Sequence, residues 1–124
     1  MKLPVSAETR QDLLKWCQHH YQSNLAGLVI FDPAPVNAQY PRGDLNILLV
    51  LDSAPPLERE RQETVAKMVL AVVAASSNLV CRVQTVEEIN TLAQMKLPVL
   101  EIYLREAEIL YDRDGSLRAI RPTL

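Results

Sequence analysis

Two apolar runs dominate the hydrophobic pattern of the chain. The first covers residues 25–31 (Leu-Ala-Gly-Leu-Val-Ile-Phe) and the second covers residues 45–51 (Leu-Asn-Ile-Leu-Leu-Val-Leu). Both are short and apolar at almost every position, which is typical of strands that helices cover on both faces. Residues 32–44 between them contain three prolines and cannot form a regular helix throughout. The pattern predicts two central strands joined by an irregular connection.

Apolar positions recur at helical spacing on both sides of these runs. Residues 7–23 follow a good N-cap at Ser6 and carry an apolar stripe, which predicts a first helix. Residues 57–76 have the longest helical pattern. Its first turns, residues 58–63, hold five charged side chains, which we interpret as a solvated face.

Shorter elements follow in the second half of the chain. We expect a strand over 79–84, a helix to residue 94 opened by the capping box of Thr85 and Glu88, a helical turn over 99–105 and a strand over 108–111. Residues 116–124 are expected to form an extra edge strand or a loose arm. The order of elements predicts one α/β (α+β) domain over residues 1–124, with a mixed sheet of three to five strands packed against helices.

Composition restricts the function classes. The formal net charge of −2 argues against a dedicated nucleic-acid binder, although it leaves room for a small local site. We see no signal peptide and no apolar run long enough for a membrane span. Cys17 and Cys81 fall inside predicted elements and are interpreted as reduced core residues of a cytoplasmic protein. His19 and His20 diverge by about 100° on a helix, so we interpret them as surface residues rather than as a shared ligand pair.

The junction between the two apolar runs carries the candidate chemistry. Asp32 follows the first run and Asp44 precedes the second. If the two strands pair antiparallel, the end of one lies beside the start of the other, and both carboxylates can approach. The alternative is that both aspartates serve local turns. Asp52 ends the second run, about 26 Å along a strand from Asp44, and is therefore left out of this site.

These segments resemble the minimal nucleotidyltransferases of the DNA polymerase β superfamily. Phe31-Asp32-Pro33 stands where that family has Phe-Gly-Ser, and residues 43–50 (Gly-Asp-Leu-Asn-Ile-Leu-Leu-Val) stand where it has Ser-Asp-Ile-Asp-Leu-Leu-Val. The step from Pro33 to Asp44 is eleven residues, which matches the family's step from Ser to Asp. Residues 106–111 (Glu-Ala-Glu-Ile-Leu-Tyr) also resemble the family's closing segment. The resemblance spans residues 25–111.

The resemblance implies a reaction that this chain is poorly equipped to perform. The family transfers a nucleoside monophosphate from an NTP to a hydroxyl, using two Mg²⁺ ions held by carboxylates. Asp44 matches the first carboxylate, but Asn46 occupies the second position, and a neutral amide is a poorer Mg²⁺ ligand. The strand over 79–84 supplies no third carboxylate and carries Arg82 instead.

The turn that the resemblance matches to the family's phosphate-binding turn is also poorly suited to the reaction. Asp32 places a negative charge where phosphate would bind, and Pro33 removes an N–H donor. Arg42 could bind a phosphate or form a surface ion pair, and the sequence does not separate the two.

Three functions therefore stay open. The first is a degenerate nucleotidyltransferase-fold pseudoenzyme without a cofactor, in which Asp44, Asn46 and Asp32 are vestigial. It would act as a binding or regulatory module, with a small helical partner as in toxin–antitoxin pairs. The second is an active Mg²⁺-dependent nucleotidyltransferase with a site rebuilt from Asp32 and Asp44. The third is an unrelated small α/β protein that forms homo-oligomers through Tyr103, Leu110 and the C-terminal segment.

Overall fold

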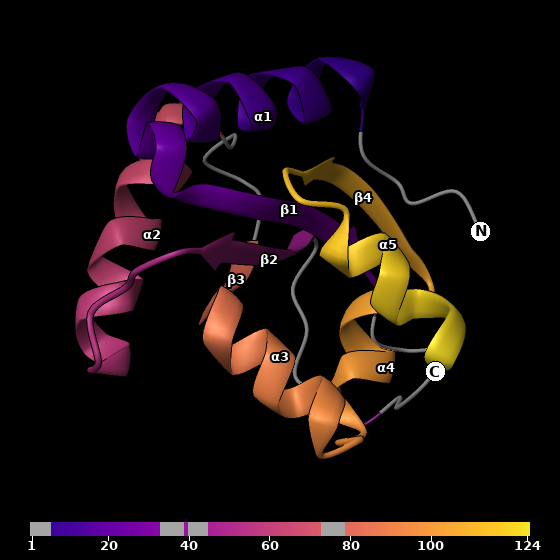
Figure 1. Ribbon diagram of the computed structural model, residues 1–124. Helices are drawn as coiled ribbons and strands as arrows, with labels where there is room; N and C mark the ends of the chain where they lie inside the picture. Colours follow the sequence, from indigo (N-terminus) through magenta and orange to yellow (C-terminus); the bar gives the residue numbers. More distant parts are fainter. Residues whose placement is uncertain (1–5, 33–38, 40–44, 73–78) are drawn as a thin grey trace.

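The computed structural model describes residues 6–32, 39, 45–72 and 79–124 (Figure 1). Its helices are α1 (Ala7–Tyr21), α2 (Glu58–Val72), α3 (Val86–Gln94), α4 (Val99–Leu104) and α5 (Ser116–Ile120), with 3₁₀ turns η1 (Gln22–Asn24) and η2 (Arg121–Thr123). Its strands are β1 (Leu25–Phe31), β2 (Leu45–Leu51), β3 (Leu79–Thr85) and β4 (Ala107–Asp112). The two central strands have the bounds that the apolar runs predict.

The four strands form one mixed sheet in the order β3-β2-β1-β4. β1 pairs antiparallel with both β2 and β4, whereas β2 and β3 are parallel. The expected mixed sheet of three to five strands is therefore confirmed. β1 and β2 are buried at every position because they occupy the centre of the sheet and have helices on both faces.

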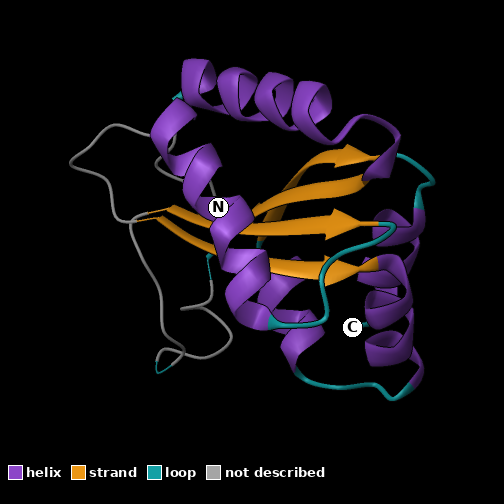
Figure 2. Cartoon of the chain, turned by 90° about the vertical axis from the view of Figure 1, so that its left-hand side faces the viewer, coloured by secondary structure: helices purple, strands orange, loops and turns teal. Residues whose placement is uncertain are grey.

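Two hydrophobic cores lie on the two faces of the sheet. α1 and α2 cover one face, where Leu13, Cys17 and Met68 pack against alternate residues of the central strands. α3, α4 and α5 cover the other face, where Ile89, Leu100 and Leu117 do the same. Figure 2 shows helices on both sides of the strands. The result is a three-layer domain in which the sheet separates an α1–α2 layer from an α3–α5 layer.

The charged first turns of α2 are only partly a solvated face. Glu58, Arg59 and Glu63 are exposed as expected, but Arg61 is 8% exposed, so the expectation is wrong for this residue. Its Nε donates to the carbonyl oxygen of Pro55 at 2.6 Å, and its Nη1 donates to the carbonyl oxygen of Val83 at 3.0 Å.

The side chains of Arg61 and Gln62 protect the outer edge of the sheet. Arg61 Nη1 also reaches Glu88 Oε1 at 2.8 Å, which joins α2 to α3 across the end of β3. Next to it, Gln62 Nε2 donates to the carbonyl oxygen of Cys81 at 3.0 Å. Edge strands expose backbone groups that can pair with another chain, and these two side chains donate to carbonyl oxygens of the edge strand β3.

The C-terminal segment corrects the expectation of an edge strand or a loose arm. Residues 116–120 form α5 because the Asp112 carboxylate accepts hydrogen bonds from the backbone N–H groups of Leu117 (3.3 Å) and Arg118 (3.0 Å). Leu117 is 2% exposed and packs over β1 in the second core. The helix is therefore held by tertiary contacts that the local sequence pattern does not show.

Gly27 is the point where α5 packs most closely on the sheet. A Cβ atom at this position would lie 2.7 Å from Leu117 Cδ1 and 3.3 Å from Val50 Cβ. We expect Gly27→Ala to lower the free energy of unfolding by about 1–3 kcal/mol through overpacking. Urea denaturation measures the change. In a Leu117→Ala background the same substitution should cost less, since the closest contact is gone while the contact with Val50 remains; an equal cost in both backgrounds would contradict this packing.

The remaining residues of interest fall where the sequence places them. Cys17 and Cys81 are free and buried, as expected of reduced core residues. His19 and His20 are exposed, and the His20 ring stacks on Trp16 with ring centroids 4.5 Å apart. Among the described helices, none is long and apolar enough to cross a membrane.

Candidate functional site

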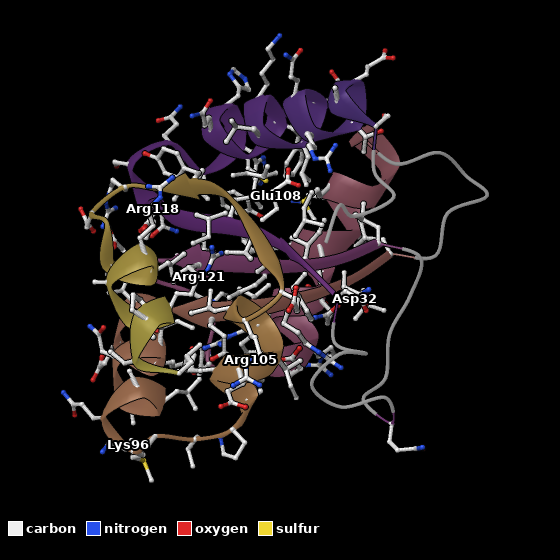
Figure 3. All side chains as sticks on the ribbon, turned by 90° about the vertical axis from the view of Figure 1, so that its right-hand side faces the viewer. Asp32, Lys96, Arg105, Glu108, Arg118 and Arg121 are labelled. Carbon is white, nitrogen blue, oxygen red and sulfur yellow. The ribbon has the colours of Figure 1, made fainter. Side chains whose placement is uncertain are left out.

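The antiparallel pairing of β1 and β2 brings the end of one strand beside the start of the other. The register pairs Ile30 with Ile47, so that Asp32, directly after β1, lies level with Leu45, the first residue of β2. Figure 3 shows the Asp32 side chain at this end of the sheet. Asp44, Pro33 and Arg42 lie outside the described residues, so their predicted roles at the junction stay predictions.

Asn46 lies inside the protein on the second core face of β2. It is 7% exposed and alternates with Leu48, which belongs to the core beneath α3–α5. In the parallel register Leu48 pairs with Arg82 of β3, which places Arg82 on the same face as Asn46. The position of the second carboxylate is thus a buried amide, and a guanidinium stands on the neighbouring strand.

An aromatic pair closes this face at the end of β1. The Phe31 and Tyr103 rings meet edge to face with centroids 5.3 Å apart, and Tyr103 is 3% exposed. The suggestion that Tyr103 and Leu110 form an oligomer surface is therefore wrong for Tyr103. Leu110 is partly buried against the first core and lies on the edge strand β4, so its role in an oligomer stays a prediction. Helical spacing places Tyr103 three residues after buried Leu100, which is the signal that could have assigned it to the core.

The described donor set does not fit a two-Mg²⁺ centre. Mg²⁺ prefers carboxylate oxygens and repels cations, whereas Asn46 offers a neutral amide and Arg82 brings a positive charge. Within residues 6–32, 39, 45–72 and 79–124, no three or more His, Cys, Asp or Glu side chains come together as a metal site. We therefore derive no chemical step through Mg²⁺.

Asp52 belongs to an ion-pair cluster at the opposite end of β2. Arg113 Nη1 and Nη2 donate to its two carboxylate oxygens, each at 2.8 Å, and Arg113 also contacts Asp114 at 2.7 Å. These hydrogen bonds hold the pKa of Asp52 below its ordinary value. Arg113 Nη1 further donates to the carbonyl oxygen of Ser23 at 2.8 Å. The cluster ties three chain segments together, which explains Asp52 without a catalytic role.

The sheet and its helices together define a class of protein. An antiparallel β1–β2 pair, a long helix, a parallel β3 and a β4 that returns to the free side of β1 form the nucleotidyltransferase-like arrangement. The chain therefore has a nucleotidyltransferase-like fold.

Three solved structures that match this fold are toxin–antitoxin complexes. A toxin–antitoxin complex with AMP-PNP and a mutant of the MntA–HpeT toxin–antitoxin pair each match with a TM-score of 0.56 at 10% identity. Both matches cover 92% of this chain and 82% of the other. A tri-AMPylated Shewanella oneidensis HEPN toxin in complex with MNT antitoxin matches with a TM-score of 0.54 at 9% identity, over 93% and 82% of the two chains. At these identities the likeness shows the fold alone. No family model and no curated protein matches the sequence.

Proposed function

We propose that this protein is a non-catalytic member of the nucleotidyltransferase fold that acts by binding a partner protein. The observation that supports this most is that Asn46 and Arg82 lie on the same face of the neighbouring strands β2 and β3. The family resemblance implies a metal-binding carboxylate at the position of Asn46 and a third one on the strand that carries Arg82. A buried amide and a guanidinium leave the surrounding core intact while removing the negative charge that would hold Mg²⁺ against NTP phosphates.

The solved structures support a protein partner. Each of the three similar structures is a complex of a toxin with an antitoxin, and one of them contains a HEPN toxin. We propose that this chain likewise binds a small helical protein of the toxin type. Such a role needs a stable fold and a complementary surface, and it does not need nucleotidyl transfer.

Nucleotide titration tests the loss of catalysis. Isothermal titration of the purified protein with each of the four NTPs in the presence of Mg²⁺ should give no saturable heat up to about 1 mM nucleotide. The Asp44→Ala variant should give the same flat titration. Metal-dependent binding in the micromolar range that Asp44→Ala removes would overturn the proposal.

The second candidate is an active transferase whose site uses Asp32 and Asp44. The antiparallel pairing of β1 and β2 favours it, because this pairing brings Asp32 level with the start of β2. It predicts transfer of label from an α-labelled NTP to protein or RNA, with Mg²⁺ bound at these aspartates. Transfer that is lost in both Asp32→Asn and Asp44→Asn would establish this function, and absence of transfer to every protein and RNA acceptor tested would leave it without support.

A further inference from the structure

A groove runs across the outside of the α3–α5 layer. It lies between the end of α3, the start of α4 and the segment α5–η2, which are neighbours in Figure 1. A pocket of about 240 Å³ and an adjoining hollow of about 400 Å³ share Ala93, Lys96, Ile120 and Thr123. We call this feature the α3–α5 groove. It is separate from the strand junction, and none of Asp32, Asn46 and Arg82 lines it.

The walls of the groove are mainly apolar. Leu97 and Ile120 line the pocket and stay partly exposed, and Leu100 forms its buried floor. Met95 lines neither the pocket nor the hollow, but it lies between the lining residues Gln94 and Lys96 in the chain and is 63% exposed, one of two strongly exposed large hydrophobic side chains among the described residues. Grooves with apolar walls suit the apolar face of a helix, and an exposed methionine next to them can adapt to varied partners.

Lys96 stands at the rim in a backbone conformation that costs energy. Its φ of 53° is left-handed, and the backbone N–H groups of Lys96 and Leu97 donate to the carbonyls of Ala93 and Leu92, which ends α3. This helix-ending position favours glycine, and a side chain here costs about 1 kcal/mol. The position nevertheless holds a lysine, whose long cationic side chain borders both the pocket and the hollow.

Among the described residues, two charged side chains line the groove. Lys96 borders both the pocket and the hollow, and Glu101 borders the pocket, where it faces Arg105 at 3.5 Å. Arg118 on α5 faces the Asp112 carboxylate instead, with Nη1 3.9 Å from Oδ2, and Figure 3 shows it at the opposite end of this layer from Lys96. Lys96 is therefore the positive charge that a carboxylate of a bound partner would meet.

We infer that the α3–α5 groove binds an amphipathic helix of a partner protein, with apolar side chains in the groove and a carboxylate at Lys96. This inference rests on the proposed function in taking the partner to be a helical protein, and it adds the surface and the charge of that partner. The cost of the Lys96 conformation is offset in the complex by the ion pair that the side chain forms there.

The test uses two synthetic helical peptides of about five turns. Both carry leucines at i, i+3, i+4 and i+7; one has glutamates on its flanks and the other has lysines. The peptides are titrated into ¹⁵N-labelled full-length protein, and amide shifts are followed. We expect saturable binding of the acidic peptide about tenfold tighter than of the basic one, with shifts at Ala93, Lys96 and Ile120.

Matched variants separate the groove from general charge effects. Lys96→Glu should weaken the acidic peptide about tenfold, whereas Lys67→Glu, an exposed reversal on α2, should leave binding unchanged. Lys96→Gly keeps the left-handed turn and removes the side chain, so it should bind several-fold more weakly while being at least as stable as the parent. This variant keeps the test valid if Lys96→Glu folds poorly.

Three results would overturn the inference: no saturable binding of either peptide, equal binding of both, or shifts outside the groove. Self-association in sedimentation that Lys96→Glu abolishes would also overturn it, by assigning the groove to a second copy. The nucleotide titrations probe the strand junction and are independent of Lys96. Failure of the peptides with flat nucleotide titrations therefore rejects the groove alone, whereas metal-dependent nucleotide binding rejects the proposed function whatever the peptides do.

Discussion

Replacing Arg61 with alanine should lower the free energy of unfolding by about 3 kcal/mol. The guanidinium is buried and donates to the carbonyls of Pro55 and Val83 and to the carboxylate of Glu88. Removing it leaves three acceptors without this donor at the place where α2, α3 and the end of β3 meet. Urea denaturation monitored by circular dichroism measures the loss.

Arg59→Ala is the matched control for this substitution. Arg59 lies in the same helix and is exposed, so its removal should change stability by less than about 0.5 kcal/mol. The dependence of stability on pH in acid gives a second measurement. Burial acts to raise the pKa of Glu88, but hydrogen bonds from Arg61 and Thr85 lower it overall.

A lowered pKa contributes stability that is present above the unfolded value and is lost as the pH falls through the folded value. In Arg61→Ala this loss in acid should be smaller than in the parent. Equal costs for Arg61→Ala and Arg59→Ala would show that the buried contacts do not stabilise the domain.

The second large effect is a loss of stability in alkali that originates in the first core. Burial raises the pKa of the Cys17 thiol to about 12 and raises the pKa of Cys81 as well. An unfolded cysteine ionises near pH 8.5. Their contribution is therefore complete below about pH 8.5 and is lost as the pH rises toward the folded values. Stability should fall by up to about 1.4 kcal/mol per pH unit for each thiol above that point.

Two measurements check this expectation. Urea denaturation at several pH values should show the alkaline decline, and the double variant Cys17→Ala/Cys81→Ala should show a shallower one. A thiol reagent at pH 8 should react with both cysteines in urea and with neither in the native protein over the same time. Rapid reaction of the native thiols, or an unchanged alkaline slope in the double variant, would contradict the burial of these groups.

Local pattern was enough to predict most of the elements. The bounds of the two central strands, the capping box of Thr85 and Glu88, and the helix after it are confirmed because each depends on residues close in sequence. Apolar periodicity also predicted α1 and α2, although their common face of the sheet is known only from the structure. The class of fold followed from the order of these elements together with the resemblance around Asp44.

Features that depend on distant residues were not predictable in this way. Arg61 looks like part of a charged surface until the end of β3 supplies the carbonyl of Val83. Residues 116–120 show no strong helical pattern, and α5 depends on Asp112 and on the space above Gly27. At the candidate site, the sequence alone showed that Asn46 and Arg82 differ from the family pattern. That both side chains lie on the same face of the sheet could be known only from the β2–β3 register.

The pairing of β1 with β4 has a consequence for synthesis of the chain. β1 is a central strand, yet the partner on one of its sides lies about 80 residues further along. At a translation rate of 5–20 residues per second, roughly 4–16 s pass before that partner leaves the ribosome. During this interval one edge of an apolar strand has no native partner, so nascent chains that stop before β4 are the form of this protein most prone to aggregation and most in need of a chaperone.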